Sequence, residues 1–509
     1  MTEAKAGGGA PILARAARHG ERLALVDGEG KCTYERLLAL ASGVAGALLA
    51  GRVDLGEERV VFLTQPGIPW VAAQWGIWLA GGIAVPLPLG APLPELEYLL
   101  DDTRATVAVV DESAEPVLAA ALAARRVRLV RLREAMGASP AARLPEVGPG
   151  RRAMIIYTSG TTSRPKGVVT THGNITAQIT TLVDAWGWSG GDRTLLCLPL
   201  HHVHGIINVV SCALWAGATC EMLPRFDGET VWERLASGEL TVFMAVPTIY
   251  TRLIALWEAA GPERRQAMSR GCGRLRLMVS GSAALPVSTL EKWRAISGHT
   301  LLERYGMTEI GMALSNPLRG ERVPGSVGVP LPGVGVQLVD EAGAPVAEGA
   351  PGEIAVRGPS VFREYWGREE ATRQAFRNGW FRTGDVAVVE RGVYRILGRT
   401  SVDIIKTGGH KVSALEIEEI LREHAAIGEC AVVGVADAEW GERVAAAVVL
   451  RPGMSLELEE LRGWAHQRLA VHKIPSRLLT LAALPRNAMG KVMKPAVSAL
   501  FQPDEPVAK

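Results

Sequence analysis

The sequence contains few cysteines and no excess of either charge. Its six cysteines stand far apart among 509 residues, so neither a disulfide scaffold nor a zinc site of the C-x-x-C type is indicated. Such a spacing is typical of buried thiols in a reducing compartment. Lys+Arg number 55 and Asp+Glu 53, a balance that gives no sign of a polyanionic partner such as nucleic acid.

A long uninterrupted apolar run is also missing. The most apolar segment, residues 70–89, is broken by Gln74, Gly81 and Pro86 among others, whereas a membrane span needs about 20 mostly apolar residues. Residues 1–5 lack an apolar signal core and include an acid, so no transit peptide is evident. We expect a protein of the mitochondrial matrix if such a peptide has been removed or lost, and a cytoplasmic protein otherwise.

Strand and helix patterns alternate along the chain to about residue 330. Residues 33–49 have leucine and alanine at helical spacing after Thr33, a candidate N-cap, and residues 70–79 form a second helical pattern. The strand patterns are 59–63, 83–87, 107–110, 194–198, 242–246 and 276–279. This alternation predicts an α/β fold with doubly wound, mainly parallel sheets.

The pattern changes after residue 330. Short strands at 335–339, 352–356 and 392–397 are separated by Gly and Pro turns, which predicts a small β-barrel or meander. A further α/β segment follows, with an amphipathic helix at 415–424 and a strand at 430–435. Because 509 residues exceed what one core supports, we expect more than one domain.

A loop rich in hydroxyls follows the apolar run 154–156. Residues 157–167 read Tyr-Thr-Ser-Gly-Thr-Thr-Ser-Arg-Pro-Lys-Gly, and their backbone N–H groups, hydroxyls and lysine suit phosphate oxygens. The loop is not a Walker A motif, because Pro165 precedes Lys166 and Gly167 follows it. A mobile surface loop would explain the composition, but not the order of strand, loop and basic tail.

Five further motifs follow this loop. They are Leu-Pro-Leu-His-His-Val-His-Gly at 198–205, Tyr-Gly-Met-Thr-Glu at 305–309, Trp-Phe-Arg-Thr-Gly-Asp at 380–385, Gly-Arg at 398–399 and Pro-Arg-Asn-Ala-Met-Gly-Lys at 485–491. In this order they resemble the acyl-adenylate-forming superfamily of acyl-CoA synthetases, luciferases and peptide-synthetase adenylation domains. Residues 278–285 and 302–309 are most similar to malonyl-CoA synthetases, in particular the mitochondrial malonate and methylmalonate acyl-CoA synthetase family.

This resemblance implies an enzyme that uses ATP and Mg²⁺ to form an acyl-AMP and then transfers the acyl group to coenzyme A. The phosphates would lie against Thr158, Ser159, Gly160, Thr161, Thr162 and Lys166. The adenosine would contact Gly281, Ser282, Ala283, Glu303, Tyr305, Asp385 and Arg399. Thr308 would contact the α-phosphate, and Glu309 with Thr161 would hold the metal. A core tyrosine, a helix-capping threonine and a surface ion pair of Asp385 are the alternatives for individual residues.

The resemblance makes Lys491 the catalytic lysine, bridging the attacking carboxylate and the α-phosphate; a solvated lysine is the alternative. It also implies a large N-terminal domain over 1–398, a hinge over 399–403, and a smaller mobile α+β domain over 404–509. The large domain would contain two doubly wound subdomains and the small β-barrel. Within the hinge, Asp403 is favoured. Rotation of the small domain would bring Gly408, Gly409 and Lys411 to the coenzyme A tunnel, unless the two glycines form only a structural turn.

Arg304 suggests which acid is activated. A guanidinium in a dry acyl pocket is costly unless an anion pairs with it, and the second carboxylate of malonate or methylmalonate would be such an anion. His204, His202, Ser280 and Met307 are further candidates for this pocket, with Ser282 an alternative to Ser280. Arg304 could instead pair internally, for example with Glu303, and the histidines could be satisfied core residues.

We therefore predict a malonate–CoA ligase acting on small molecules, without nucleic acid or membrane partners, as a monomer or small homo-oligomer. The alternatives are a ligase for another short- or medium-chain carboxylate and an adenylation enzyme that loads a carrier protein. A non-catalytic nucleotide sensor is disfavoured by the presence of Lys491 and Glu309.

Overall fold

The computed structural model describes residues 10–158, 165–486 and 492–501. Five of the predicted site residues, Ser159, Gly160, Thr161, Thr162 and Lys491, lie outside the described residues. None of the described helices combines the length and the apolar character that crossing a bilayer requires.

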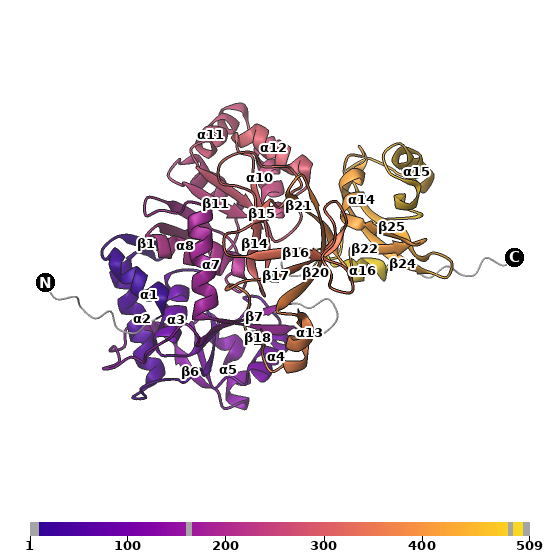
Figure 1. Ribbon diagram of the computed structural model, residues 1–509. Helices are drawn as coiled ribbons and strands as arrows, with labels where there is room; N and C mark the ends of the chain where they lie inside the picture. The colour runs from indigo at the N-terminus through magenta and orange to yellow at the C-terminus, as the bar shows by residue number, and fades with distance from the viewer. Residues whose placement is uncertain (1–9, 159–164, 487–491, 502–509) are drawn as a thin grey trace.

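A seven-stranded sheet contains the strands β7 and β8, in which the described ends of the predicted phosphate loop lie (Figure 1). Its order is β18 (Glu364–Tyr365), β8 (Lys166–Thr171), β7 (Arg152–Thr158), β4 (Ile83–Pro86), β3 (Arg59–Leu63), β5 (Val107–Val110) and β6 (Arg128–Arg131). The strands from β7 to β6 are parallel, whereas β8 is antiparallel to both of its neighbours, β7 and β18. Strands β7 and β8, the described strands on either side of the predicted phosphate loop, are antiparallel neighbours.

A nine-stranded sheet carries the other predicted nucleotide and acyl residues. Its order is β15 (Val329–Pro330), β14 (Gly311–Ser315), β13 (Leu302–Met307), β12 (Leu277–Ser280), β11 (Val242–Ala245), β9 (Arg193–Leu196), β10 (Thr219–Met222), β1 (Leu23–Asp27) and β2 (Gly30–Thr33). The six strands from β13 to β1 are parallel. The two sheets confirm the prediction of doubly wound, mainly parallel α/β layers.

Two helices that the sequence predicts lie in the largest hydrophobic core. Helix α2 (Tyr34–Leu49) begins after Thr33, whose hydroxyl accepts from the N–H of Arg36 at 3.2 Å and so confirms the predicted N-cap. Helix α3 (Ile68–Leu79) is buried at every position from Trp70 to Leu79. Gly76 allows the two helices to approach each other closely, since a Cβ at this position would lie only 2.5 Å from the Cβ of Val44.

The remaining helices of this part cover the two sheets. They are α1 (Pro11–Ala16), η1 (Ala17–His19), α4 (Leu93–Thr103), α5 (Glu115–Ala124), α6 (Leu132–Met136), α7 (His172–Ala185), the π-helix η2 (His204–Ser211), α8 (Cys212–Ala216), α9 (Gly228–Ala236), α10 (Pro247–Ala259), α11 (Pro262–Cys272) and α12 (Val287–Ser297).

A five-stranded antiparallel sheet follows, as the short Gly-bounded strand patterns predict. It contains β16 (Gly335–Val339), β17 (Gly352–Arg357), β20 (Trp380–Glu390), β19 (Phe376–Arg377) and β21 (Val393–Arg399), with helix α13 (Glu369–Ala375) beside it. Strands β19 and β21 both pair with β20. The strand pairs of the described residues therefore make an open antiparallel meander, which is one of the two predicted arrangements, and none of these pairs closes a barrel.

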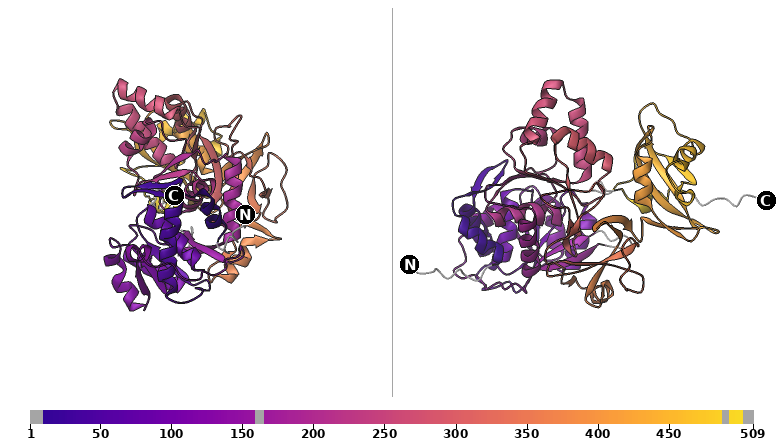
Figure 2. Two further views of the ribbon diagram at one scale, coloured as in Figure 1. Left: turned by 90° about the vertical axis from the view of Figure 1, so that its left-hand side faces the viewer. Right: turned by 45° about the horizontal axis from the view of Figure 1, so that its top comes forward.

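The C-terminal part forms its own α+β unit, which stands beside the larger part in Figure 1 and in the right view of Figure 2. It contains β22 (Ile404–Thr407), β23 (His410–Ser413), α14 (Ala414–Leu421), β24 (Ile427–Asp437), β25 (Gly441–Leu450), α15 (Leu458–His466), η3 (Val471–Lys473), β26 (Arg477–Thr480) and α16 (Lys494–Ser498). Its two hydrophobic clusters draw only on residues after 404. The boundaries at 398 and 404 themselves stay predictions.

Candidate active site

Strand β13 ends in the turn that carries several of the predicted residues. Met307 pairs with Gly311 across the β13–β14 hairpin, so Thr308 and Glu309 occupy the tight turn between them. Strands β12 and β13 are parallel, and parallel strands end at the same edge of a sheet. Gly281 and Ser282, which follow β12, therefore lie at the edge where β13 ends.

Glu309 is a buried carboxylate next to the end of the phosphate-loop hairpin. It is 5% exposed, and burial raises its pKa. Its Oε1 accepts from the phenol of Tyr365 at 2.9 Å, and the Nζ of Lys166 lies 5.2 Å from the centroid of the same ring. The structure thus brings Glu309 and Lys166 together at Tyr365, and Thr158 is the partner of Lys166 across β7 and β8.

This arrangement suits a hard cation that is coordinated partly by the protein and partly by phosphate oxygens. Among the described residues, Glu309 forms no ion pair, and no group of three or more His, Cys, Asp or Glu side chains could hold a metal by itself. A Mg²⁺ bound to Glu309 would therefore take further oxygens from phosphate or water, as this ion commonly does.

Asp385 is held between Tyr305 and Arg399. The phenol of Tyr305 donates to Oδ2 at 2.6 Å, and Nε of Arg399 donates to Oδ1 at 2.9 Å. Asp385 and Arg399 are paired residues of β20 and β21. The carboxylate is 8% exposed, so its charge is compensated within the protein and its orientation is fixed.

Arg304 and His204 converge on the hydroxyl of Ser282. An Nη of Arg304 donates to Oγ of Ser282 at 3.3 Å, and Nδ1 of His204 lies 3.2 Å from the same oxygen. Arg304 is 4% exposed, and burial lowers its pKa to about 9. Gly281 makes room for the guanidinium, because a Cβ there would lie 2.5 Å from Cζ of Arg304.

Several buried polar atoms around this cluster have no hydrogen-bond partner among the described residues. They are Nε of Arg304, Nε2 of His202 and of His204, Oγ of Ser280, and both amide atoms of Asn208. Burial lowers the pKa of His202 to about 3 and that of His204 well below its usual value, so both rings are neutral. Unpaired buried polar atoms are costly, and a polar ligand would satisfy them.

Glu303 does not pair with Arg304, which overturns the alternative of an internal ion pair between them. Adjacent residues of a strand point to opposite faces, and the Glu303 carboxylate accepts from the N–H of Gly325 at 3.3 Å. Burial raises its pKa to about 8. No described carboxylate forms an ion pair with Arg304 either. The nucleotide contact assigned to Glu303 stays a prediction.

The remaining predicted residues lie in separate places. Ala283 is exposed just after β12, and Met307 packs against the hydrophobic cluster of the five-stranded sheet. Gly408 and Gly409 form the turn between β22 and β23 with φ of +54° and +79°, and Lys411 pairs with Glu341 at 2.7 Å. The turn that the glycines form is thus observed, while their contact with coenzyme A stays a prediction.

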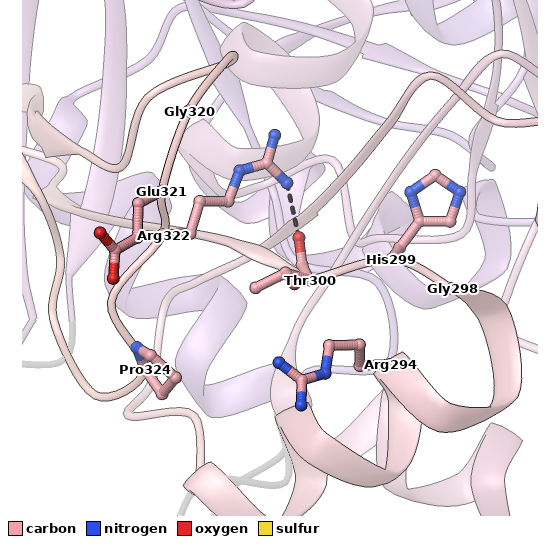
Figure 3. Close-up of a pocket in the computed structure, with 8 residues that line it drawn as sticks. All are labelled: Arg294, Gly298, His299, Thr300, Gly320, Glu321, Arg322 and Pro324. Carbon is pink, nitrogen blue, oxygen red and sulfur yellow. Dashed lines mark hydrogen bonds between the residues drawn. The ribbon is translucent and has the colours of Figure 1, made fainter.

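A cavity of about 450 Å³ lies away from these residues (Figure 3). It is lined by Arg294, Gly298, His299, Thr300, Gly320, Glu321, Arg322 and Pro324. Thr300 precedes β13, whereas Thr308 and Glu309 follow it, so the cavity lies at the opposite end of this strand. The guanidinium of Arg322 donates to the carbonyl of Thr300 across it.

Two residues of the site are missed by the sequence analysis. Tyr365 contacts Glu309 from a position 56 residues away, and no motif marks it. Asn208 lies four residues after His204 on η2 and is 0% exposed. Its helical spacing from a predicted pocket residue was the available signal, and π-helical turns often occur at functional sites.

Comparison with known proteins decides the family. The model of the AMP-binding enzyme family matches residues 12–366, and that of the AMP-binding enzyme C-terminal domain matches residues 416–491. The chain belongs to the AMP-binding enzyme family. This membership confirms the resemblance that the six motifs indicate, and it accords with the separate C-terminal unit.

Individual members of the family are similar to this chain over nearly its full length. The mitochondrial malonate–CoA ligase of Homo sapiens is 48% identical over 532 residues, which cover 97% of this chain and 92% of the relative. ATP-bound MatB from Rhodopseudomonas palustris superimposes with a TM-score of 0.89 at 36% identity, covering 97% of this chain and 99% of that one. The apo form of MatB, with the same identity and coverage, gives a TM-score of 0.80.

Proposed function

We propose that this AMP-binding enzyme is a malonate–CoA ligase, which converts malonate, ATP and coenzyme A to malonyl-CoA, AMP and pyrophosphate through malonyl-AMP. The observation that carries the proposal is Arg304, a buried guanidinium with a free Nε and no carboxylate partner among the described residues. The full-length similarity to malonate–CoA ligase at 48% identity supports it.

In this proposal the second carboxylate of malonate pairs with Arg304. A guanidinium binds a carboxylate in a bidentate geometry, and the anion would offset the burial that lowers the pKa of Arg304. Neutral His204 can donate through Nε2, and Ser280 and Asn208 offer further unpaired polar atoms. A monocarboxylate would leave the guanidinium unpaired, which is the physical basis for rejecting acetate and fatty acids.

The other end of the malonate would react at the β13 turn. Thr308 would contact the α-phosphate, Asp385 the ribose hydroxyls, and Glu309 would hold Mg²⁺, which supplies charge neutralisation to the phosphates when bound. Thr158 and Lys166, with Ser159, Gly160, Thr161 and Thr162, would hold the departing pyrophosphate. Lys491 would approach the carboxylate oxygen and the α-phosphate. The site thus brings together two anions that would otherwise repel each other.

A pyrophosphate-release assay with ATP, Mg²⁺ and coenzyme A tests the proposal. Malonate is expected to exceed acetate, octanoate and succinate in kcat/KM by at least tenfold. Methylmalonate is expected to lie closer to malonate, because one methyl group alters binding by only about 1–3 kcal/mol. A preference for acetate or octanoate would retain adenylation and reject the dicarboxylate pocket.

The relatives named mitochondrial support a location in the mitochondrial matrix, and cell fractionation with a matrix marker checks it. Size-exclusion chromatography with light scattering checks the predicted monomer or small homo-oligomer.

A further inference from the structure

The C-terminal unit contacts the larger part through the N-terminus of helix α12. The N–H of Val287, the first residue of α12, donates to Oε1 of Glu419 on α14 at 2.8 Å. No side chain from the segment preceding α12 caps this helix. The first N–H groups of a helix lack intrahelical partners and form its positive end, so the Glu419 carboxylate caps α12 from a position 132 residues away.

Helix α12 continues directly from the predicted adenine loop. Gly281, Ser282 and Ala283 of that loop are followed by Leu285 and Pro286, and α12 begins at the next residue. The cap by Glu419 therefore fixes the C-terminal unit against the segment that would contact the adenosine. A shift of the C-terminal unit would break this contact.

Glu419 is connected to the predicted hinge by a series of ion pairs. Arg422 binds Glu419 at 3.3 Å and Glu418 at 3.2 Å. The Nζ of Lys494 lies 2.8 Å from Glu418 and 2.6 Å from Asp403. The side chains of Glu418, Lys494 and Asp403 are 5%, 12% and 15% exposed, and those of Arg422 and Glu419 are 29% and 33% exposed. Each partner therefore restricts the position of the next, most strongly at the buried end of the series.

From Asp403 the polar contacts continue to Arg399 of β21 and then to Asp385 of β20. The Oδ2 of Asp403 accepts from the N–H of Arg399 at 3.0 Å, and the Arg399 side chain binds Asp385. One continuous set of polar contacts thus runs from α12, through the C-terminal unit, to the carboxylate predicted to bind ribose. Within this set, Glu419 of the C-terminal unit makes the contact with α12, and Asp403 of the predicted hinge makes the contact with β21.

The geometry points to Glu419 as a positioning residue that holds the C-terminal unit in the arrangement used to form the acyl-AMP. This inference rests on the proposed function. Over the whole chain, the structure superimposes better on ATP-bound MatB than on apo MatB, with TM-scores of 0.89 and 0.80. The hydrogen bond from Val287 to Glu419 then breaks when the C-terminal unit rotates for the coenzyme A step.

Two substitutions remove the contact from opposite sides. Glu419→Ala removes the acceptor, and Val287→Pro removes the donor without touching α14. Proline is tolerated at the first position of a helix, and Pro286 already has the extended conformation that must precede proline, with φ −59° and ψ 134°. Glu423→Ala is the matched control, because this glutamate lies one turn after Glu419 and is exposed.

The first measurement needs no substrate. Spin labels at Ala295→Cys on α12 and Glu460→Cys on α15 replace exposed side chains, and the six native cysteines are buried. We expect the interdomain distance distribution to broaden in Glu419→Ala and in Val287→Pro, and to stay unchanged in Glu423→Ala. An unchanged distribution in the first two variants would overturn the positioning role, whichever acid the enzyme activates.

The second measurement separates the two half-reactions. Both variants are expected to lower pyrophosphate release from ATP and malonate about tenfold, as the loss of one charged hydrogen bond implies. Transfer from supplied malonyl-AMP to coenzyme A should change less than twofold. An equal loss in both half-reactions would indicate a general structural defect and overturn the inference. If the enzyme adenylates another acid normally but does not adenylate malonate, the proposed function is rejected instead.

Discussion

The phenol of Tyr305 donates to Oδ2 of Asp385 at 2.6 Å. This contact joins the turn-bearing strand β13 to β20 of the five-stranded sheet. Burial, with the adjacent charge of Asp385, raises the pKa of Tyr305 well above its usual value, so the phenol keeps its proton and acts as a donor. Tyr305 therefore orients the carboxylate that is predicted to receive the ribose hydroxyls.

Tyr305→Phe should raise the KM for ATP about tenfold. The substitution keeps the ring that would stack on adenine and removes only the O–H, and a hydrogen bond to a charged group is worth about 1.5–3 kcal/mol. The KM for malonate should change less than twofold, as measured by initial rates. Tyr394→Phe is the control, since Tyr394 is a half-buried tyrosine of β21. Equal effects of both substitutions would contradict the role of the Tyr305 hydroxyl.

Arg304→Met should raise the KM for malonate at least thirtyfold and leave the KM for ATP within threefold. Leaving a buried charge of the ligand unpaired costs about 2–5 kcal/mol. The melting temperature of the unliganded variant should not fall, because the substitution removes a buried cation that has no carboxylate partner among the described residues. Equal rises in both KM values would indicate that Arg304 has a structural role.

Arg322→Met provides the control for this measurement. The guanidinium of Arg322 donates to the backbone carbonyls of Thr300, Pro317 and Leu318. Its loss should therefore lower the melting temperature and spare the KM for malonate, which is the opposite of the pattern expected for Arg304.

The sequence predicts local features of this protein well because they depend on local physics. The cap at Thr33, the helix predicted over 70–79 and the strand patterns follow from residue spacing alone. The bond from Tyr365 to Glu309 and that from Val287 to Glu419 join segments 56 and 132 residues apart, and no spacing rule relates them. That Arg304 has no carboxylate partner among the described residues likewise depends on where distant carboxylates lie.

Glu303→Gln should stabilise the fold at high pH and have little effect at low pH. The pKa of Glu303 is raised from 4.5 to about 8, chiefly by burial and in addition by Glu419. Between these pH values the folded chain holds a proton that the unfolded chain has released, so the stability of the wild type falls as the pH rises through this window. The substituted amide would keep an acceptor for the N–H of Gly325 and remove the titration.

Urea unfolding at pH 5, 6.5 and 8 measures this effect. The gain in unfolding free energy of Glu303→Gln over the wild type should grow with pH, to the order of a few kcal/mol at pH 8. Glu423→Gln, at an exposed position, should show no such growth. A gain that is the same at the three pH values would contradict the raised pKa of Glu303.

Lys494→Met should strongly destabilise the C-terminal unit. The ammonium lies 2.6 Å from Asp403 and 2.8 Å from Glu418, and its side chain is 12% exposed. Removing one partner of a buried ion network leaves uncompensated charges and costs about 3–5 kcal/mol. Lys473→Met is the matched control, because Lys473 pairs with Glu416 at 2.7 Å where the glutamate is 38% exposed, and such pairs contribute about 0–1 kcal/mol.

Thermal unfolding monitored by circular dichroism distinguishes the two lysines. Lys494→Met should lower the midpoint by several degrees more than Lys473→Met. In the double variant Lys494→Met, Glu418→Gln, part of the loss should return, because the side chain at position 418 is then neutral while Asp403 remains charged. If the double variant is no more stable than Lys494→Met alone, the charge of Glu418 is not what Lys494 compensates.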